Sequence, residues 1–141
     1  MTIEEKVRGI IAEYFSGFSY VFEDWQTADK KIDKVALPAV IHIVPVSGTF
    51  DFGRHGRIRD AEVSIIAFVD KVCKEADGKD NAEVYNSMKN MAIEFIKKCN
   101  ESGFFEPIEG TVTYYPLYEQ LASIVSGVMV SLTLKELVGR C

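Results

Sequence analysis

Apolar residues recur at helical spacing in two parts of the chain, and each part has its own start signal. In the first, Thr2 and Glu5 form the capping-box pattern ahead of an apolar stripe over residues 3–15. In the second, over residues 80–99, an aspartate in the N-cap position is followed three positions later by a glutamate, and Gly103 marks the end. Two amphipathic helices are therefore predicted.

Five further segments carry the patterns of β-strands. A strand with one buried face alternates apolar and polar residues, whereas a strand covered on both faces is apolar throughout. The predicted strands are residues 18–23, 38–44, 58–70, 108–114 and 124–134. The polar, lysine-rich residues 26–36 are expected to form a loop, a Gly-containing loop is expected before residue 58, and residues 116–122 are expected to connect the last two strands.

The order of these elements is α-β-β-β-α-β-β, which predicts an α+β fold. Strands that follow one another along the chain can form a single, mostly antiparallel sheet, and both helices can then pack on one face of it. Residues 38–44 are apolar on both sides and are expected to form a central strand. The chain has 141 residues, a common size for one domain, so we expect residues 1–141 to form a single domain with one core.

Composition and charge narrow the classes of partner. Hydrophobic residues make up 48% of the chain and charged residues 26%, which favours an ordered core over a disordered chain. The formal net charge of −5 disfavours attraction of the whole molecule to nucleic acid or anionic lipid. The N-terminal residues are acidic where a secretory signal is basic, and no apolar run reaches the length of a membrane span. We therefore expect a cytoplasmic protein without a membrane partner.

The sequence carries none of the motifs that indicate a catalytic or cofactor site. It has no Gly-rich nucleotide-binding motif, no G-x-S-x-G nucleophile elbow and no H-E-x-x-H metal motif. Its two histidines, His42 and His55, are too few for a multi-histidine metal centre, and the mid-strand position of His42 is typical of a structural sheet histidine. These absences predict a non-enzymatic protein with no cofactor and no metal.

The three cysteines, Cys73, Cys99 and Cys141, have no C-x-x-C spacing, so neither a disulfide framework nor a zinc site is predicted. Cys73 is flanked by Lys71 and Lys74, and positive neighbours can lower the pKa of a thiol. An inert thiol is the favoured interpretation, because a reactive one needs an electropositive pocket that sequence alone does not define.

The segment from residue 50 to residue 59 collects three arginines and two phenylalanines in an otherwise acidic chain. The candidate contact residues are Phe50, Phe52, Arg54, Arg57 and Arg59. Arginine binds phosphate or carboxylate, and an aromatic side chain stacks on a base or fills a pocket in a partner. The alternative, favoured for an isolated monomer, is a solvated hairpin turn whose arginines pair with the chain's own acids. Between the two kinds of partner, protein is favoured over nucleic acid because the rest of the chain is acidic.

One helix at Ile3–Phe15, strands around Val40–Val44 and Val63–Val69, a second helix at Val84–Cys99 and a strand at Val128–Leu134 follow one another along nearly the whole chain. This order, together with the length, the early central strand and the closing hairpin, resembles the tail-terminator or tail-completion proteins of long-tailed bacteriophages and prophages. The resemblance lies in the pattern of elements and not in a signature motif.

That resemblance implies a non-enzymatic subunit of a ring, commonly a hexamer, that caps the tail tube and joins it to the head. Its partners would be further copies of itself, tail-tube proteins and head-connector proteins, and it would be a component of the virion. A ring built by head-to-tail contacts needs two different patches on each subunit. The arginine segment could meet acids at Glu23–Asp24 or Glu75–Asp77, or it could face the lumen, through which DNA passes.

Two alternative functions stay open at this point. One is a small intracellular interaction domain of unassigned role. The other is a nucleic-acid-binding accessory domain that uses Arg54, Arg57 and Arg59, whose affinity would fall steeply as salt is added.

Overall fold

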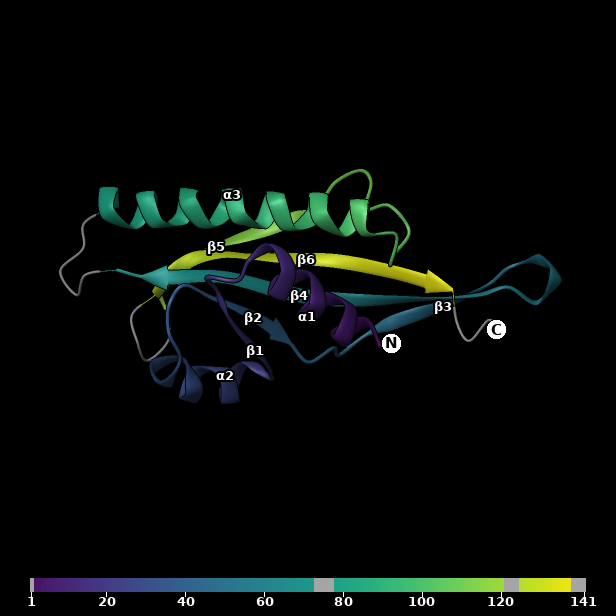
Figure 1. Cartoon of the computed structure of the whole chain (residues 1–141), viewed down its shortest axis with the longest axis horizontal. Helices are drawn as coiled ribbons and strands as arrows, with labels where there is room; N and C mark the ends of the chain where they lie inside the picture. The colour runs from purple at the N-terminus through teal and green to yellow at the C-terminus, as the bar shows by residue number, and fades with distance from the viewer. Residues whose placement is uncertain (1, 73–77, 121–124, 138–141) are drawn as a thin grey trace.

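The computed structural model describes residues 2–72, 78–120 and 125–137, which form one sheet with helices on both of its faces (Figure 1). In chain order the elements are α1 (Ile3–Tyr14), β1 (Ser19–Glu23), α2 (Trp25–Lys31), a 3-10 turn (Ile32–Lys34), β2 (Ala39–Ile43), β3 (Gly48–Phe52), a second 3-10 turn (Arg54–Gly56), β4 (Ile58–Lys71), α3 (Gly78–Ser102), β5 (Thr113–Gln120) and β6 (Val125–Leu137). The predicted α+β fold with one mostly antiparallel sheet is confirmed.

The strands of the sheet lie in the order β1-β2-β4-β6-β5, and β3 pairs with β4 beyond the end of β2. Among the described pairs only β1 with β2 is parallel. The longest ladder joins β4 to β6, from Arg59↔Leu137 to Lys71↔Val125. Along its other edge β4 pairs first with β3 and then with β2, so these two short strands lie end to end.

Helices α1 and α3 pack on the same face of the sheet, as predicted from their apolar stripes. The centre of this layer is Phe68 of β4, which is fully buried. Its ring centroid lies 5.7 Å from that of Phe95, 6.3 Å from that of Phe15 and 6.4 Å from that of Phe18. Aromatic rings at these separations stabilise a core beyond the area that they bury. Among the described residues, no helix is both long and apolar enough to cross a membrane.

The predicted ends of α1 and α3 agree with the structure in part. The capping box of α1 is present, because Glu5 N donates to Thr2 Oγ1 at 3.1 Å and Thr2 N donates to Glu5 Oε1 at 3.2 Å. Helix α3 already includes Gly78, so Asp80 lies in the first turn and is not the predicted N-cap. A carboxylate in the first turn is still stabilised by the positive end of the helix dipole. The chain leaves α3 at Gly103, whose φ of +75° suits glycine.

Residues 26–36 contain a helix, so the prediction of a loop there is wrong. Asp24 caps α2, since its carboxylate accepts a hydrogen bond from Thr27 N at 2.8 Å. Ala28 and Ile32, four positions apart, are fully buried against the face of the sheet that α1 and α3 leave free. The prediction that the helices pack on one face therefore holds for two of them, and α2 covers part of the opposite face.

Two strands lie where connections are predicted. β3 occupies part of the expected Gly-containing loop. β5 begins only at Thr113, near the end of the strand predicted over 108–114, and runs on through the first part of the expected connection 116–122. Pro116 lies inside β5 and lacks an amide hydrogen, which is tolerated because β5 is at the edge of the sheet. The remaining residues of that predicted connection, from 121 on, lie in a gap between the described ranges.

Close contact between β4 and β6 requires glycine at position 127. A Cβ atom on Gly127 would lie 1.9 Å from the carbonyl oxygen of Phe68 and 2.9 Å from Cα of Val69. These distances are far below van der Waals contact, and both neighbouring atoms belong to the backbone of a central strand. A side chain at this position would force the two strands apart.

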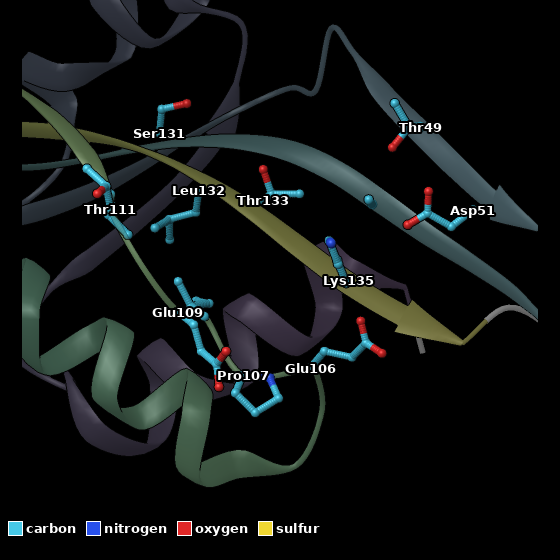
Figure 2. Close-up of a pocket in the computed structure, with 13 residues that line it drawn as sticks. Thr49, Asp51, Glu106, Pro107, Glu109, Thr111, Ser131, Leu132, Thr133 and Lys135 are labelled. Atoms are coloured by element: carbon cyan, nitrogen blue, oxygen red, sulfur yellow. The ribbon is translucent and has the colours of Figure 1, made fainter. Parts of the chain in front are cut away.

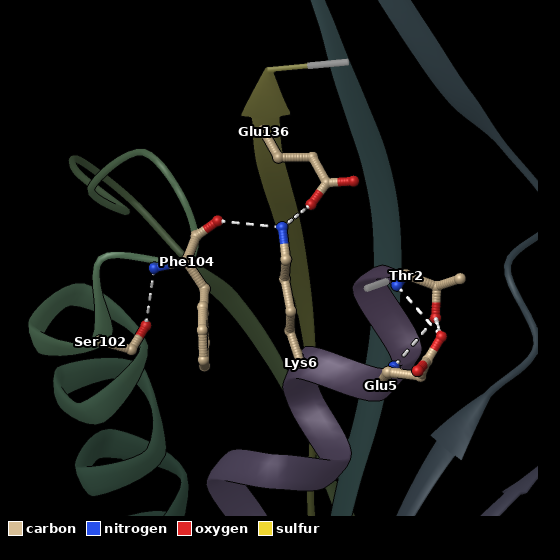
Figure 3. Close-up of polar contacts among 6 residues, drawn as sticks. All are labelled: Thr2, Glu5, Lys6, Ser102, Phe104 and Glu136. Carbon is tan, nitrogen blue, oxygen red and sulfur yellow. Dashed lines mark hydrogen bonds and ion pairs between the residues drawn. The ribbon is translucent and has the colours of Figure 1, made fainter. Parts of the chain in front are cut away.

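Lys6 joins α1 to the end of β6 (Figure 3). Its Nζ forms an ion pair with Glu136 and lies 3.5 Å from the carbonyl oxygen of Phe104. The same nitrogen lies 5.6 Å from the centroid of the Phe105 ring, on whose face a cation is stabilised. The two charged side chains are only 16% and 17% exposed, so water screens this pair less than a surface pair.

Candidate functional site

β3 and the start of β4 form a hairpin at one end of the sheet, and its turn projects beyond the end of β6 (Figure 1). We call residues 48–62 the arm. Five residue pairs join its two strands, from Gly48↔Glu62 to Phe52↔Ile58. All five residues of β3 are exposed. Among the described strands β3 pairs only with β4, so its other edge presents main-chain groups that have no partner strand.

The tip of the arm, residues 53–57, is a defined turn. Gly53 N donates to Arg57 O at 2.7 Å and closes it. His55 and Gly56 both have left-handed backbone conformations, with φ of +62° and +72°. Because backbone bonds define the turn, the side chains of Arg54 and Arg57 are not needed to hold it and remain exposed to solvent.

Two aromatic side chains of the arm are exposed to water. Phe50 is 64% exposed and Phe52 is 77% exposed. The two are separated by one residue on a strand and therefore project from the same face of the arm. A pair of phenylalanines on a projecting hairpin, next to arginines, has the composition found at the centre of protein interfaces.

The predicted arginine cluster is divided by the fold. Arg59 lies opposite Asp51 near the tip end of the β3–β4 ladder, and its Nε is 2.6 Å from Glu106 Oε1. The contact is an ion pair and not an aligned hydrogen bond, because the geometry of the N–H group leaves it without an acceptor. Arg54 and Arg57 form no ion pair with any described residue. The hairpin turn is thus confirmed, while pairing with the chain's own acids holds for Arg59 alone.

The acids predicted to receive the arginines do not fit that role well. Glu23 is paired with Lys31, and Asp24 caps α2. The other suggested pair, Glu75–Asp77, lies outside the described residues. If the tip arginines bind carboxylates of a second copy, those carboxylates must come from another part of the surface.

A cavity of about 710 Å³ lies beside the arm, and we call it the cradle (Figure 2). Its sheet side is lined by Thr49, Asp51, Ala61, Ser131, Thr133 and Lys135. Its other wall is the segment 106–112, which connects α3 to β5 and includes Glu106 and Glu109. Figure 2 shows Asp51 and Thr49 on β3, across the cavity from this wall.

The cradle is hollow because α2 covers only part of its face of the sheet. Ala67 and Val69 of β4 are buried in the cluster that includes residues of α2. Ala61 projects from the same side of β4, since alternate residues of a strand share a face, but it lies toward the arm, beyond that cluster. Around Ala61 the lining includes the short side chains of Thr49 and Thr133 and the longer one of Lys135, and none of the lining residues belongs to α1, α2 or α3.

His42 of β2 is a buried titratable group with one polar neighbour, Tyr20. Its Nδ1 lies 2.9 Å from the hydroxyl of Tyr20, and its Nε2 has no hydrogen-bond partner within the described structure. Burial lowers the pKa of His42 to about 4 and raises the pKa of Tyr20 above its usual value. The imidazole is therefore neutral at pH 7. Its predicted place in the middle of a strand is confirmed, but only one of its ring nitrogens is hydrogen-bonded.

Cys99 is buried in α3, and burial raises the pKa of its thiol to about 12. It stays protonated at neutral pH and is a free thiol in the core. Cys73 and Cys141 lie outside the described residues, so the alternative of a reactive Cys73 thiol stays a hypothesis. In the described ranges, no three His, Cys, Asp or Glu side chains are grouped closely enough to hold a metal ion.

No family model matches this chain, and no curated protein sequence matches it either. The molecule is thus defined as an α+β protein with a single sheet, a projecting arm and an open cradle. Its function has to be inferred from these surfaces.

Proposed function

We propose that this chain is a non-enzymatic assembly subunit that binds other protein chains through its arm. The observation that carries the proposal is the exposure of Phe50 and Phe52 beside two arginines that have no ion-pair partner in the described structure. Aromatic residues and arginine dominate the binding energy of protein interfaces when both become buried. In the free subunit this arm contacts water, and a partner would remove that apolar area from water.

The partner that the charges favour is another copy of the same chain. The chain carries a formal net charge of −5, while the tip of the arm carries two arginines and no acid. A cationic tip and an acidic body attract each other in head-to-tail order, which closes into a ring or continues as a filament. A ring subunit of this kind, commonly in a hexamer, is what the resemblance to phage tail-terminator proteins implies. Under this proposal the tail tube and head connector are further partners, and the protein is found in the cytoplasm before it joins the virion.

Nucleic acid is the competing partner. The ion pair between Arg59 and Glu106 removes one of the three predicted arginines from a phosphate-binding set. The remaining two would neutralise about two phosphates, which corresponds to weak binding with a shallow dependence on salt. DNA passing through the lumen of a ring is compatible with such weak contacts.

The first experiment is light scattering on a size-exclusion column over a range of protein concentrations at low and high salt. We expect an oligomer whose mass falls for Arg57→Glu and at high salt. Lys79→Glu is the matched control, because it makes the same change of charge at an exposed residue far from the arm in sequence. Equal effects of the two substitutions would mean that Arg57 acts only through the net charge of the protein. A wild-type protein that stays monomeric and binds DNA would favour the competing function.

A further inference from the structure

We infer that the cradle of one subunit receives the tip of the arm of the next subunit. This inference rests on the proposed function and names the second patch that a head-to-tail assembly requires. It joins two exposed features of the described structure: the tip at residues 53–57 and the cavity beside the arm.

The tip of a subunit does not reach its own cradle. β3 is held to β4 by a ladder of five residue pairs, and the turn is closed by the bond from Gly53 N to Arg57 O. Figure 1 shows the turn of the hairpin lying beyond the end of β6 and away from the helices. Since β3 itself supplies Thr49 and Asp51 to the cradle, folding the tip back would destroy the cavity. A tip in the cradle must belong to another molecule.

The cavity is large enough for a few side chains of a hairpin turn. Its volume of about 710 Å³ is within the range of roughly 300–1,000 Å³ that encloses a group of drug size. It is also open to solvent, as a surface that receives a turn of another protein must be. Hydroxyl groups of Thr49, Ser131 and Thr133 line its sheet side and can donate to and accept from the main chain of an incoming turn.

The charges of the two patches are opposite. The cradle is lined by the carboxylates of Asp51, Glu106 and Glu109 and by a single cation, Lys135. Glu106 is held by Arg59, whereas Asp51 and Glu109 have no ion pair among the described residues. The tip brings Arg54 and Arg57, which are also without ion pairs. Arginine and carboxylate can form paired, charge-assisted hydrogen bonds, which define the orientation of the partners as well as their attraction.

A contact between unlike patches predicts a specific result when two defective subunits are mixed. The tip variant is Arg54→Glu/Arg57→Glu, and the cradle variant is Glu109→Arg. Each alone lacks one patch and is expected to lose the wild-type oligomer. In an equimolar mixture, the intact tip of the cradle variant meets the intact cradle of the tip variant. One contact forms per pair and none can follow it, so light scattering should give a mass twice that of the monomer.

The matched control for the cradle variant is Glu13→Arg, which makes the same change of charge at an exposed position on α1. The control for the tip variant is Lys34→Glu/Lys79→Glu, which matches its change of charge at two exposed lysines. Both controls should keep the wild-type oligomer. Circular dichroism of each variant checks that all remain folded, as expected for substitutions of exposed side chains.

A weak contact is detected by a second measurement, nuclear magnetic resonance of isotope-labelled cradle variant with unlabelled tip variant. The amide signals of residues 53–57 are expected to shift in this mixture, and not when the unlabelled partner also carries Glu109→Arg.

The outcomes separate the inference from the proposed function. If the tip variant is monomeric while Glu109→Arg keeps the wild-type oligomer, the arm is an interface but the cradle is not its acceptor. If the mixture gives neither a dimer nor shifted signals, the inference is wrong. If the wild type is monomeric and its tip signals do not move with concentration, the head-to-tail proposal and the inference both fail.

Discussion

In the second half of β4, Ile66 to Val69 lie in the middle of the sheet and are fully shielded from water. In the first half, the same strand joins β3 in the arm, where the aromatic side chains of β3 are exposed. The two regions share one strand and one kind of hydrogen bonding, yet they obey different constraints. In the body, volume and shape decide which residue fits. In β3 and the tip of the arm, the side chains are exposed, so their identity points to what they meet outside the molecule.

The sharpest test of this contrast compares two phenylalanines. Phe68→Ala should lower the free energy of unfolding by about 3–5 kcal/mol, because it opens a cavity among the rings around it. Phe52→Ala should change it by less than about 0.5 kcal/mol, because Phe52 is 77% exposed. Urea denaturation followed by circular dichroism measures both. A large loss of stability in Phe52→Ala would mean that Phe52 packs against the rest of the protein, and the difference drawn between the two regions would be wrong.

Gly127→Ala is expected to be the next largest effect, with a loss of about 3 kcal/mol, since the added Cβ meets the backbone of Phe68. Gly9→Ala is the matched control. Gly9 lies in α1 with no atom within 4 Å of an added Cβ, so that substitution should stabilise the protein by about 0.5–1 kcal/mol. Denaturation of the two variants side by side distinguishes a steric cost from a general effect of alanine.

The buried His42 should make the body sensitive to acid. Its pKa is about 4 in the folded chain, below the ordinary value of 6.5, so the unfolded chain binds the proton first as the pH falls. Its contribution to stability is complete above pH 6.5 and decreases toward pH 4. At pH 5 the free energy of unfolding is therefore lower by about 2 kcal/mol than it is at neutral pH, from His42 alone.

Denaturation of the wild type, His42→Gln and His55→Asn at a series of pH values tests whether His42 causes this loss of stability. The loss between pH 7 and pH 5 should shrink for His42→Gln and persist for His55→Asn, which changes the exposed histidine at the tip of the arm. An unchanged pH dependence in His42→Gln would assign the effect to other groups.

The smallest expected effect is at the ion pair of Lys6 and Glu136. The exposure of these two side chains is intermediate between that of the buried core and that of the arm. Lys6→Met should lower stability by about 1 kcal/mol, because it leaves Glu136 partly buried without its cation. Lys97→Met, at an exposed pair with Glu94, should cost almost nothing. A double-mutant cycle of Lys6→Met with Glu136→Gln measures the coupling, and a coupling near zero would mean that Lys6 acts through its packing on Phe105 alone.

The helices α1 and α3 and the strands β2 and β4 could be predicted because each repeats its signal many times. Strand β4, for instance, is predicted over residues 58–70 and found over Ile58–Lys71. Helix α2 carries only two buried apolar positions, Ala28 and Ile32, among lysines and other polar residues. A pattern so short resembles a polar loop, although Asp24 is an N-cap residue type and was a usable start signal. β3 shows the alternation Phe50-Asp51-Phe52, but its glycine and its charges indicate a turn equally well.

The candidate site was predictable only in part. The residues of the arm stand together in the sequence, so Phe50, Phe52, Arg54 and Arg57 could be selected before their exposure was known. The ion pair of Arg59 could not be predicted, because Glu106 is far away along the chain. The same holds for the cradle, whose two sides come from the strands β3, β4 and β6 and from the segment 106–112.

The amino-acid sequence by itself determined the class of the fold and the chemistry of the arm, because helical and strand periodicity and the choice of side chains are local properties. Tertiary structure alone decided where α2 packs, which end of the sheet stays uncovered, and which carboxylates surround the resulting cavity. Those outcomes depend on how strands distant in the sequence pair and on how far a short helix reaches across a sheet. Such contacts arise from the competition of the whole chain for burial, and no single segment encodes them.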